Sequence, residues 1–274
     1  MAIPTHTLND GHQLPAIGLG TYGLRGEAGT ASVLSALDTG YRLLDTALNY
    51  ENEREVGEAV RQTSVPRADI VVTTKLPGRH HGYDETLASF AESLTNLGLD
   101  HVDLYLIHWP LPRVNKYIDS WRAMIRLRDD GLVRSIGVSN FTPEQITRLL
   151  AETGVAPAVN QVELHPYFGQ PQLRDFDSGH GIATESWSPL GKGVASNPAL
   201  AGIALAHGVT ASQVVLRWHV QLGAIPIPKS GDSKRQRENI EVFEFSLSDA
   251  EMESIGSLES GRLWGADPVT HEEF

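Results

Sequence analysis

The stretch Gly40-Tyr41-Arg42-Leu43-Leu44-Asp45-Thr46-Ala47-Leu48-Asn49-Tyr50 is the starting point for the fold of this chain. Residues 41–44 predict a short buried strand that runs directly into polar residues. Asp45 stands where this strand should end, and Tyr50 falls in the loop before the next predicted helix. An acid at a strand end with a phenol nearby favours a functional site, although a turn-capping Asp and a core Tyr would give the same pattern. The remaining sequence has to separate these two interpretations.

Segments of strand character alternate with helical segments along the chain. The predicted strands cover residues 17–20, 41–44, 70–75, 102–108, 133–138, 158–162, 182–186 and 224–228. The predicted helices cover residues 28–39, 51–62, 83–97, 118–130, 142–152, 171–180, 196–207, 212–221, 233–241 and 248–258. Eight strand–helix units predict an α/β fold, a closed (β/α)₈ TIM barrel in one domain over residues 1–274. An N-terminal β-hairpin around Asp10-Gly11 and extra C-terminal helices complete it.

Composition narrows the classes of protein to which the chain can belong. The 41% of hydrophobic residues is enough for a core, and the absence of cysteine excludes disulfides and thiolate metal sites. No Lys or Arg occurs in the first 24 residues, and no run of 18 apolar residues exists. We therefore expect a cytoplasmic protein without a secretion signal or membrane span. The net charge of −12 disfavours general binding to nucleic acid.

Polar or aromatic residues recur at or near the predicted strand ends, at positions 45, 75, 108, 139, 161 and 187. A barrel opens every strand end on one face, where active sites are built, whereas a Rossmann fold would lack its Gly-x-Gly-x-x-Gly signature here. Asp45, Lys75 and His108 would then share a rim with Tyr50. Taken singly, Lys75 could be a solvated rim charge and His108 a core histidine. The four together favour chemistry.

A Tyr in this setting is a candidate proton donor. Its ordinary pKa is about 10, and the ammonium of Lys75 should lower it. Asp45 would hold Lys75 in place, and His108 could orient a substrate carbonyl by a hydrogen bond. Tyr50 would then protonate the carbonyl oxygen as a general acid. This chemistry suits a reaction that delivers hydride to a carbonyl carbon.

Several longer sequence motifs extend over nearly the whole chain. They are Gly-Tyr-Arg at 40–42, Asp-Thr-Ala at 45–47, Asn-Glu at 52–53, Thr-Lys-Leu at 74–76, Asp-Leu-Tyr-Leu-Ile-His-Trp-Pro at 103–110, Ser-Ile-Gly-Val-Ser-Asn-Phe at 135–141, Asn-Gln-Val-Glu-Leu-His-Pro at 160–166, Ser-Pro-Leu-Gly at 188–191 and Ile-Pro-Lys-Ser at 227–230. The chain thereby resembles the aldo-keto reductases, which are NADPH-dependent carbonyl reductases on a (β/α)₈ barrel. Glu-Ser-Trp at 185–187 is most similar to the bacterial branch that includes 2,5-diketo-D-gluconic acid reductase.

The resemblance implies a role for individual residues. The catalytic tetrad falls on Asp45, Tyr50, Lys75 and His108, with Tyr22, Asn49, His108 and Trp109 around the substrate. NADPH or NADP contacts fall on Thr21, Tyr22, Asp45, Ser139, Asn140, Gln161, Trp187, Ser188, Leu190, Gly191, Lys229, Ser230, Arg235, Glu238 and Asn239. The resemblance also implies a small-molecule carbonyl substrate, a monomer and no metal. Pro77 and Asn49 depart from residues common in this branch, at positions that should border the substrate mouth.

The residue types agree with these implied roles. Asn and Gln side chains can pair with a carboxamide, and a flat indole such as that of Trp187 suits stacking on a nicotinamide ring. The basic residues at 229–237 could be a solvated helix face, but Lys229 and Arg235 flank a strand-end loop and a helix start. Helix N-termini favour phosphate, and Arg offers a planar fork for it. We therefore expect NADPH to bind in preference to NADH.

Two other functions remain open on the sequence. A metal-dependent barrel hydrolase could use His80, His81, His108 and His165, but no carboxylate ligands stand beside these histidines. A nicotinamide-binding regulatory module could keep the cofactor site without turnover, although such a sensor has no need of a proton donor at Tyr50. The tail with Trp264 and Phe274 is expected to influence the choice of substrate.

Overall fold

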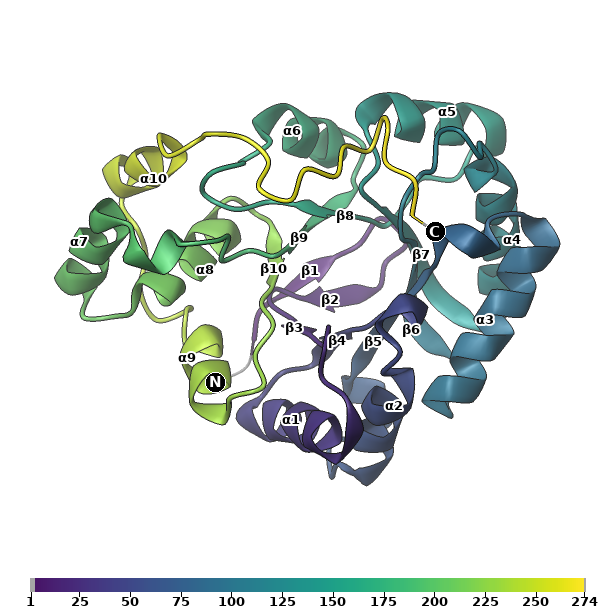
Figure 1. Ribbon diagram of the computed structural model, residues 1–274, viewed down its shortest axis with the longest axis horizontal. Coiled ribbons are helices and arrows are strands. Elements are labelled where there is room, and N and C mark those ends of the chain that lie inside the picture. The colour runs from purple at the N-terminus through teal and green to yellow at the C-terminus, as the bar shows by residue number, and fades with distance from the viewer. Residues whose placement is uncertain (1–2, 274) are drawn as a thin grey trace.

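Eight parallel strands form the barrel that the sequence predicts, and helices surround it (Figure 1). The structure is a computed structural model that describes residues 3–273, so Phe274 lies outside it. In sequence order, which is also their order around the barrel, the strands are β3 (Leu19–Gly20), β4 (Leu43–Asp45), β5 (Val71–Leu76), β6 (Val102–Ile107), β7 (Val133–Ser139), β8 (Val159–Glu163), β9 (Ala183–Trp187) and β10 (Ile225–Ile227). Backbone bonds from Gly18 N to Pro226 O (3.0 Å) and from Gly20 N to Pro228 O (3.1 Å) close the ring.

The helices follow the predicted order with small shifts at their ends. They are α1 (Gly26–Thr39), α2 (Glu53–Gln62), α3 (Tyr83–Leu97), α4 (Tyr117–Asp129), α5 (Pro143–Thr153), α6 (Pro171–Gly179), α7 (Pro198–His207), α8 (Ala211–Gln221), α9 (Ser233–Ile240) and α10 (Asp249–Gly256). Short 3₁₀ turns are η1 (Leu48–Tyr50), η2 (Arg67–Asp69), η3 (Gly78–His80) and η4 (Val194–Ser196). Thr142 caps α5 in a capping box with Gln145, and Pro143 occupies the first helical turn.

One helix boundary differs from the prediction in a way that matters for Tyr50. The predicted helix at 51–62 begins only at Glu53, because Glu51 adopts a left-handed backbone with φ of 54°. The preceding residues form the separate turn η1. This break lets Tyr50 leave the helical path and turn towards the strand ends.

The predicted hairpin is present as β1 (Thr5–Thr7) paired with β2 (Gln13–Pro15). Leu8 and Leu14 pack with Leu43, Leu104 and Ile225 inside the barrel. They fill the N-terminal end of the barrel, which leaves the carboxyl ends of the strands as the end available to a ligand. The larger core lies between the strands and the surrounding helices.

Hydrophobicity gives one observation about membranes. Within residues 3–273 no single helix is long and apolar enough to span a bilayer. The pair α7 and α8 reaches that length and composition together, but the two helices are bent by 88° at the break between them.

Candidate active site

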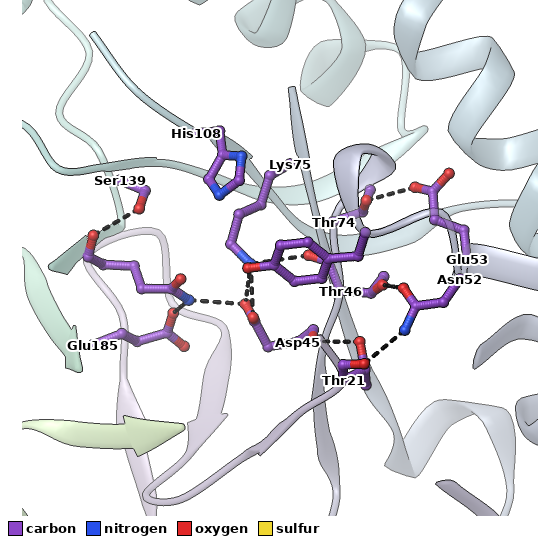
Figure 2. Close-up of polar contacts among 12 residues, drawn as sticks. Thr21, Asp45, Thr46, Asn52, Glu53, Thr74, Lys75, His108, Ser139 and Glu185 are labelled. Carbon is purple, nitrogen blue, oxygen red and sulfur yellow. Dashed lines mark hydrogen bonds and ion pairs between the residues drawn. The ribbon is translucent and has the colours of Figure 1, made fainter. Parts of the chain in front are cut away.

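A fully buried lysine forms the floor of the site. Lys75 Nζ lies 2.6 and 2.8 Å from the two carboxylate oxygens of Asp45 and 2.9 Å from the carbonyl oxygen of Thr46 (Figure 2). Adjacent parallel strands β4 and β5 carry the two side chains, so their pairing brings Asp45 and Lys75 together. Burial lowers the pKa of Lys75, but Asp45 and Tyr50 outweigh this effect and the net pKa is raised. The ammonium is therefore charged, as a buried cation with this compensation should be.

Tyr50 stands over this ion pair. Its hydroxyl lies 3.5 Å from Lys75 Nζ, and Nζ lies 4.9 Å from the centroid of the phenol ring. The sequence-based expectation of a lowered pKa is corrected by the structure. Burial raises the pKa of Tyr50 more than Lys75 lowers it, and the carboxylate of Asp45 raises it further. Tyr50 is thus a protonated phenol at neutral pH and can donate a proton.

His108 and Trp109 follow the end of β6. The ring of His108 packs edge-on against Tyr50 with centroids 5.9 Å apart. The backbone oxygen of His108 accepts a hydrogen bond of 3.1 Å from Asn140 Nδ2, which ties this loop to the end of β7. Trp109 is buried beside them.

A second acid that the sequence interpretation missed lies below the site. Gln161 Nε2 donates to Asp45 Oδ2 (2.8 Å) and to Glu185 Oε2 (2.9 Å), so it bridges the two acids. Burial and the charge of Asp45 raise the pKa of Glu185 to about 8. Glu185 could have been predicted from the sequence, because residues 185 and 187 lie on the same face of a strand and Trp187 was already a candidate site residue.

Buried polar contacts hold the turn that carries Tyr50. Asn52 Nδ2 donates to the carbonyl of Thr21 (2.7 Å), and the hydroxyl of Thr46 donates to Asn52 Oδ1 (2.9 Å). Beside them, the Thr74 hydroxyl donates to Glu53 Oε1 at 2.6 Å (Figure 2). These bonds connect η1 and α2 to the barrel strands, so the position of Tyr50 is fixed from two sides.

A cavity of about 370 Å³ opens above the floor. Most of the predicted site residues line it, and Lys75 lies directly beneath. The lining residues are Gly20, Thr21, Tyr22, Asp45, Tyr50, His108, Trp109, Ser139, Asn140, Gln161, Trp187, Ser188, Ile227, Lys229 and Trp264. Gly20, Ile227 and Trp264 were not among the predicted site residues. Gly20 and Ile227 are close in sequence to the predicted residues Thr21 and Lys229, whereas Trp264 comes from the C-terminal part of the chain.

The remaining predicted residues lie outside the walls of this cavity. Ser230 and Asn239 are buried, and Arg235 and Glu238 lie on α9. Leu190 packs against the hydrophobic core, and Gly191 closes a turn by donating from its N–H to Ser188 O (2.9 Å). Asn49 faces the C-terminal segment, where its Nδ2 donates to Glu273 Oε1 at 2.8 Å.

A closing segment, residues 261–273, runs along the rim of the barrel at the carboxyl ends of β9, β8 and β6. In Figure 1 it is the yellow coil that leaves α10 and passes α6 and α5. The buried carboxylate of Glu163 accepts from Leu263 N (2.6 Å) and from Arg262 Nη1 (3.3 Å), which anchors its beginning. Trp264 then packs edge-on against Trp187 with ring centroids 5.6 Å apart. The two indoles form one wall of the cavity.

The four histidines considered for a metal site lie in separate environments. His80 contacts the hydroxyl of Ser89, His108 faces the cavity, and His165 pairs with Glu163. His81 is buried, and burial lowers its pKa to about 4 against an opposing charge effect. Over residues 3–273 no group of three or more His, Asp and Glu side chains is arranged to hold a metal ion.

Comparison with known proteins identifies the family of this chain. The profile of the aldo/keto reductase family matches residues 16–260. The chain belongs to the aldo/keto reductase family. The resemblance and the barrel fold drawn from the sequence are thereby confirmed.

Three relatives illustrate this family membership. This aldo/keto reductase is 58% identical to 2,5-diketo-D-gluconic acid reductase B of Corynebacterium sp. (strain SHS752001), over 99% of each chain. It is 46% identical to an aldo/keto reductase structure from Brucella melitensis, with a TM-score of 0.91 over 94% of this chain and 100% of that one. A Bombyx mori aldo-keto reductase solved in complex with NADP is 35% identical, with a TM-score of 0.89 over 94% of both chains.

Proposed function

We propose that this aldo/keto reductase reduces aldehydes or ketones, including α-dicarbonyls or keto-sugars, to alcohols with NADPH as the hydride donor. The observation that carries the proposal is the protonated Tyr50 hydroxyl at the cavity floor, 3.5 Å from a buried Lys75 ammonium that Asp45 neutralises. A partly buried acid with a fixed cation behind it suits protonation of an oxygen on which negative charge develops.

The donor and acceptor set of the cavity fits a nicotinamide. The amide nitrogen of Gln161 is used by Asp45 and Glu185, which leaves its oxygen to accept from a carboxamide NH₂. Asn140 Oδ1 accepts from Trp187 Nε1 (2.8 Å) and keeps a second lone pair. The Trp187 indole supplies a flat stacking surface. The relative from Bombyx mori, which was solved with NADP, supports the same assignment.

The adenosine end of the cofactor would lie beyond Lys229. This side chain lines the cavity and is exposed, and Arg235 is exposed in the first turn of α9. Asp232 caps α9 by accepting from Arg235 N (2.9 Å), so its carboxylate opposes an anion at this helix end. Because of Asp232, we assign the 2′-phosphate to the two basic side chains rather than to the helix end alone.

The chain's own residues account for the rest of the reaction. When bound, NADPH supplies the hydride for the carbonyl carbon. Tyr50 gives its hydroxyl proton to the carbonyl oxygen, and the charge of Lys75 stabilises the phenolate that this transfer leaves. His108 orients the carbonyl, and Trp187 with Trp264 shields that side of the cavity from water. Solvent then returns a proton to Tyr50.

We also propose a substrate preference, an oligomeric state and a location for this protein. The relative from Corynebacterium is named for a diketo acid of a sugar, which favours oxygen-rich carbonyl substrates for this chain. The acidic surface, with a net charge of −12, is compatible with a cytoplasmic monomer without nucleic-acid partners. We place Tyr22 and Trp109 at the substrate side of the cavity.

A panel of carbonyl compounds tests the function. NADPH oxidation would be followed with aromatic aldehydes, methylglyoxal, diketones, keto-acids and open-chain sugars. We expect turnover of several members and a metal-independent rate after treatment with a chelator. Tight NADPH binding without turnover of any member would instead indicate a regulatory module on the same fold.

A further inference from the structure

Buried hydrogen bonds form a closed circuit behind the cavity floor (Figure 2). Lys75 Nζ donates to Thr46 O (2.9 Å), the Thr46 hydroxyl donates to Asn52 Oδ1 (2.9 Å), and Asn52 Nδ2 donates to Thr21 O (2.7 Å). The Thr21 hydroxyl then donates to Asp45 O (2.9 Å), and the Asp45 carboxylate returns to Lys75. Each of these residues is at most 4% exposed. Asp45 and Lys75 thus share one hydrogen-bond circuit with three residues that have no part in the proposed reaction.

The Asn52 side chain can take only one orientation in this circuit. Its Nδ2 lies between two backbone carbonyl oxygens, 2.7 Å from that of Thr21 and 3.0 Å from that of Leu24. A carbonyl oxygen can only accept, so the amide NH₂ has to face this pair. The Asn52 oxygen therefore faces the Thr46 hydroxyl, which has to donate to it. Both ends of the Asn52 amide are used, and its contacts define which group carries each proton.

The two carbonyls belong to the turn that presents Tyr22. Leu24 N donates to Thr21 O (2.9 Å), and Gly23 supplies the positive φ of 76° that the turn contains. Tyr22 lies within this turn and is 67% exposed, yet its ring packs edge-on against Tyr50 with centroids 5.2 Å apart. The amide nitrogen of Asn52 thus fixes the backbone that places one aromatic neighbour of Tyr50.

The amide oxygen of Asn52 reaches the other side of the phenol. Through the Thr46 hydroxyl it fixes the residue whose carbonyl accepts from Lys75 Nζ. That ammonium lies 3.5 Å from the Tyr50 hydroxyl. Asn52 is therefore a strut between the cation on one side of Tyr50 and Tyr22 on the other.

We propose that Asn52 is a positioning residue that links the Lys75 cation to the turn of Tyr22, and so holds the Tyr50 hydroxyl where it protonates the substrate. This inference rests on the proposed carbonyl reduction and adds a residue that acts only through its neighbours. It also gives a role to Thr46, which stands between Asp45 and Ala47 in one of the motifs of the sequence.

The position of a proton donor affects the rate more strongly than it affects coenzyme binding. A misplacement of about 1 Å can lower a rate ~10²-fold. The nicotinamide contacts proposed for Ser139, Gln161 and Trp187 come from β7, β8 and β9, on the other side of the barrel from Asn52. A break in the circuit should therefore lower kcat and leave most of the coenzyme affinity.

Thr46→Val cuts the circuit with little change in shape. It keeps the Thr46 carbonyl that binds Lys75 and removes the hydroxyl on which Asn52 Oδ1 depends. Thr46→Ser keeps the hydroxyl and serves as the rescue variant. Asn52→Ala removes the links to both sides at once.

Thr74→Val is the matched control. Thr74 is as completely buried as Thr46 and stands next to Lys75 in the sequence. Its hydroxyl donates to Glu53 Oε1 (2.6 Å), beside Asn52 but outside the circuit. Glu53 keeps the bond from Asn96 Nδ2 (3.1 Å) in this variant. The control therefore removes a comparable buried hydrogen bond without touching the contacts of Asn52.

The first measurement compares kcat with stability and coenzyme affinity. We expect Thr46→Val to lower kcat about 10-fold, as a small displacement of the donor does, and to change NADPH affinity by less than about threefold. Thr46→Ser should recover most of the lost kcat. Thr74→Val should lower the urea midpoint but keep the wild-type kcat. An unchanged kcat in Thr46→Val, or an equal loss in Thr46→Ser or Thr74→Val, would reduce Asn52 to a structural residue and overturn the proposal.

A double-mutant cycle tests whether Thr46 acts through Asn52. In the Asn52→Ala background, Thr46→Val should have no further effect on kcat, because both changes break the same circuit. Effects of the two changes that multiply would mean that Thr46 acts independently, and would also overturn the proposal. If Asn52→Ala did not fold, the three threonine variants would still decide the question.

The second measurement does not depend on catalysis. In protein with ¹³C-labelled tyrosine, NMR would detect the nuclear Overhauser effect between the rings of Tyr22 and Tyr50, assigned with Tyr22→Phe and Tyr50→Phe. We expect this effect in wild type, Thr46→Ser and Thr74→Val, and its loss in Thr46→Val and Asn52→Ala. An unchanged effect in the last two variants would refute the inference, whether or not a carbonyl substrate were found. If the effect responded as expected but wild type reduced no carbonyl, the proposed function would fail and the hold of Asn52 on the two tyrosines would stand.

Discussion

The floor and the rim of this cavity are built in different ways. The floor consists of Asp45, Lys75 and Gln161, whose side chains are almost completely buried. Asp45 and Lys75 come from the paired strands β4 and β5, and Gln161 comes from β8. The rim depends on contacts between distant parts of the chain, such as Glu163 with Leu263 and His108 with Glu273. The strand pairing that builds the barrel therefore also builds the chemical centre. Cofactor choice, closure and substrate choice depend on segments that pack only once the barrel exists.

The largest effect should come from Tyr50, which stands directly over the floor. Tyr50→Phe removes the hydroxyl above Lys75 and keeps the ring, so the packing against His108 and Tyr22 survives. We expect kcat to fall by at least ~10², the usual contribution of a positioned general acid. Coenzyme affinity, measured by quenching of Trp fluorescence, should stay within about twofold of wild type. Near-normal turnover would show that another group supplies the proton.

The cofactor side of the rim should give the next largest effect. Lys229→Gly or Arg235→His removes one cation from the proposed phosphate site. We expect NADPH binding to weaken ~10-fold, since a charge-assisted hydrogen bond contributes ~1.5–3 kcal/mol, and NADH binding to change little. Lys234→Gln is a suitable control, because Lys234 is exposed on the same helix and contacts Glu238 at 3.8 Å. Equal losses for both coenzymes would mean that the residues act through loop structure.

The contrast between floor and rim also describes what could be predicted from the sequence. Strand periodicity placed Asp45, Lys75 and His108 on one rim, and the structure brings them together around the cavity. The detour at Glu51 that positions Tyr50 has no signal in hydrophobic periodicity, because it depends on one left-handed residue. The tail with Trp264 was expected to influence the choice of substrate, but its contact with Trp187, about 77 positions earlier, was not predicted. The contact of Glu273 with His108, about 165 positions earlier, was not predicted either.

The net pKa of Tyr50 could not be predicted for a related reason. The sequence indicated the lowering effect of Lys75, but burial acts in the opposite direction and is larger. Burial depends on how completely the surrounding segments close over the ring. The sequence shows which charged residues could affect the pKa of Tyr50. The extent to which Tyr50 is shielded from solvent, which also affects its pKa, is known only from the fold.

Glu185, the acid next to Gln161, should make the stability of the protein depend on pH. The pKa of Glu185 is raised to about 8, so its contribution to stability is complete below the unfolded value of about 4.3 and is lost as pH rises to about 8. Glu185→Gln stays neutral and can still accept from Gln161. The difference in unfolding free energy between variant and wild type should therefore grow by about 1 kcal/mol or more between pH 5 and pH 9 in urea titrations. A constant difference over this range would show that Glu185 is ionised throughout.

The smallest effects should separate two residues of the substrate side that the sequence groups together. Trp109 lines the cavity, so Trp109→Phe should change the ratio of kcat/KM between a flat aromatic aldehyde and methylglyoxal by about three- to fivefold, as a change in pocket shape does. Asn49 does not line the cavity but binds Glu273, so it should act through the docking of the closing segment. Asn49→Ala should therefore change kcat/KM for both substrates by one common factor of about two to three. If Asn49→Ala changed the ratio of kcat/KM between the two substrates, the Asn49 side chain would contact the substrate. If Trp109→Phe changed kcat/KM for both substrates by the same factor, the indole would not form part of the pocket wall.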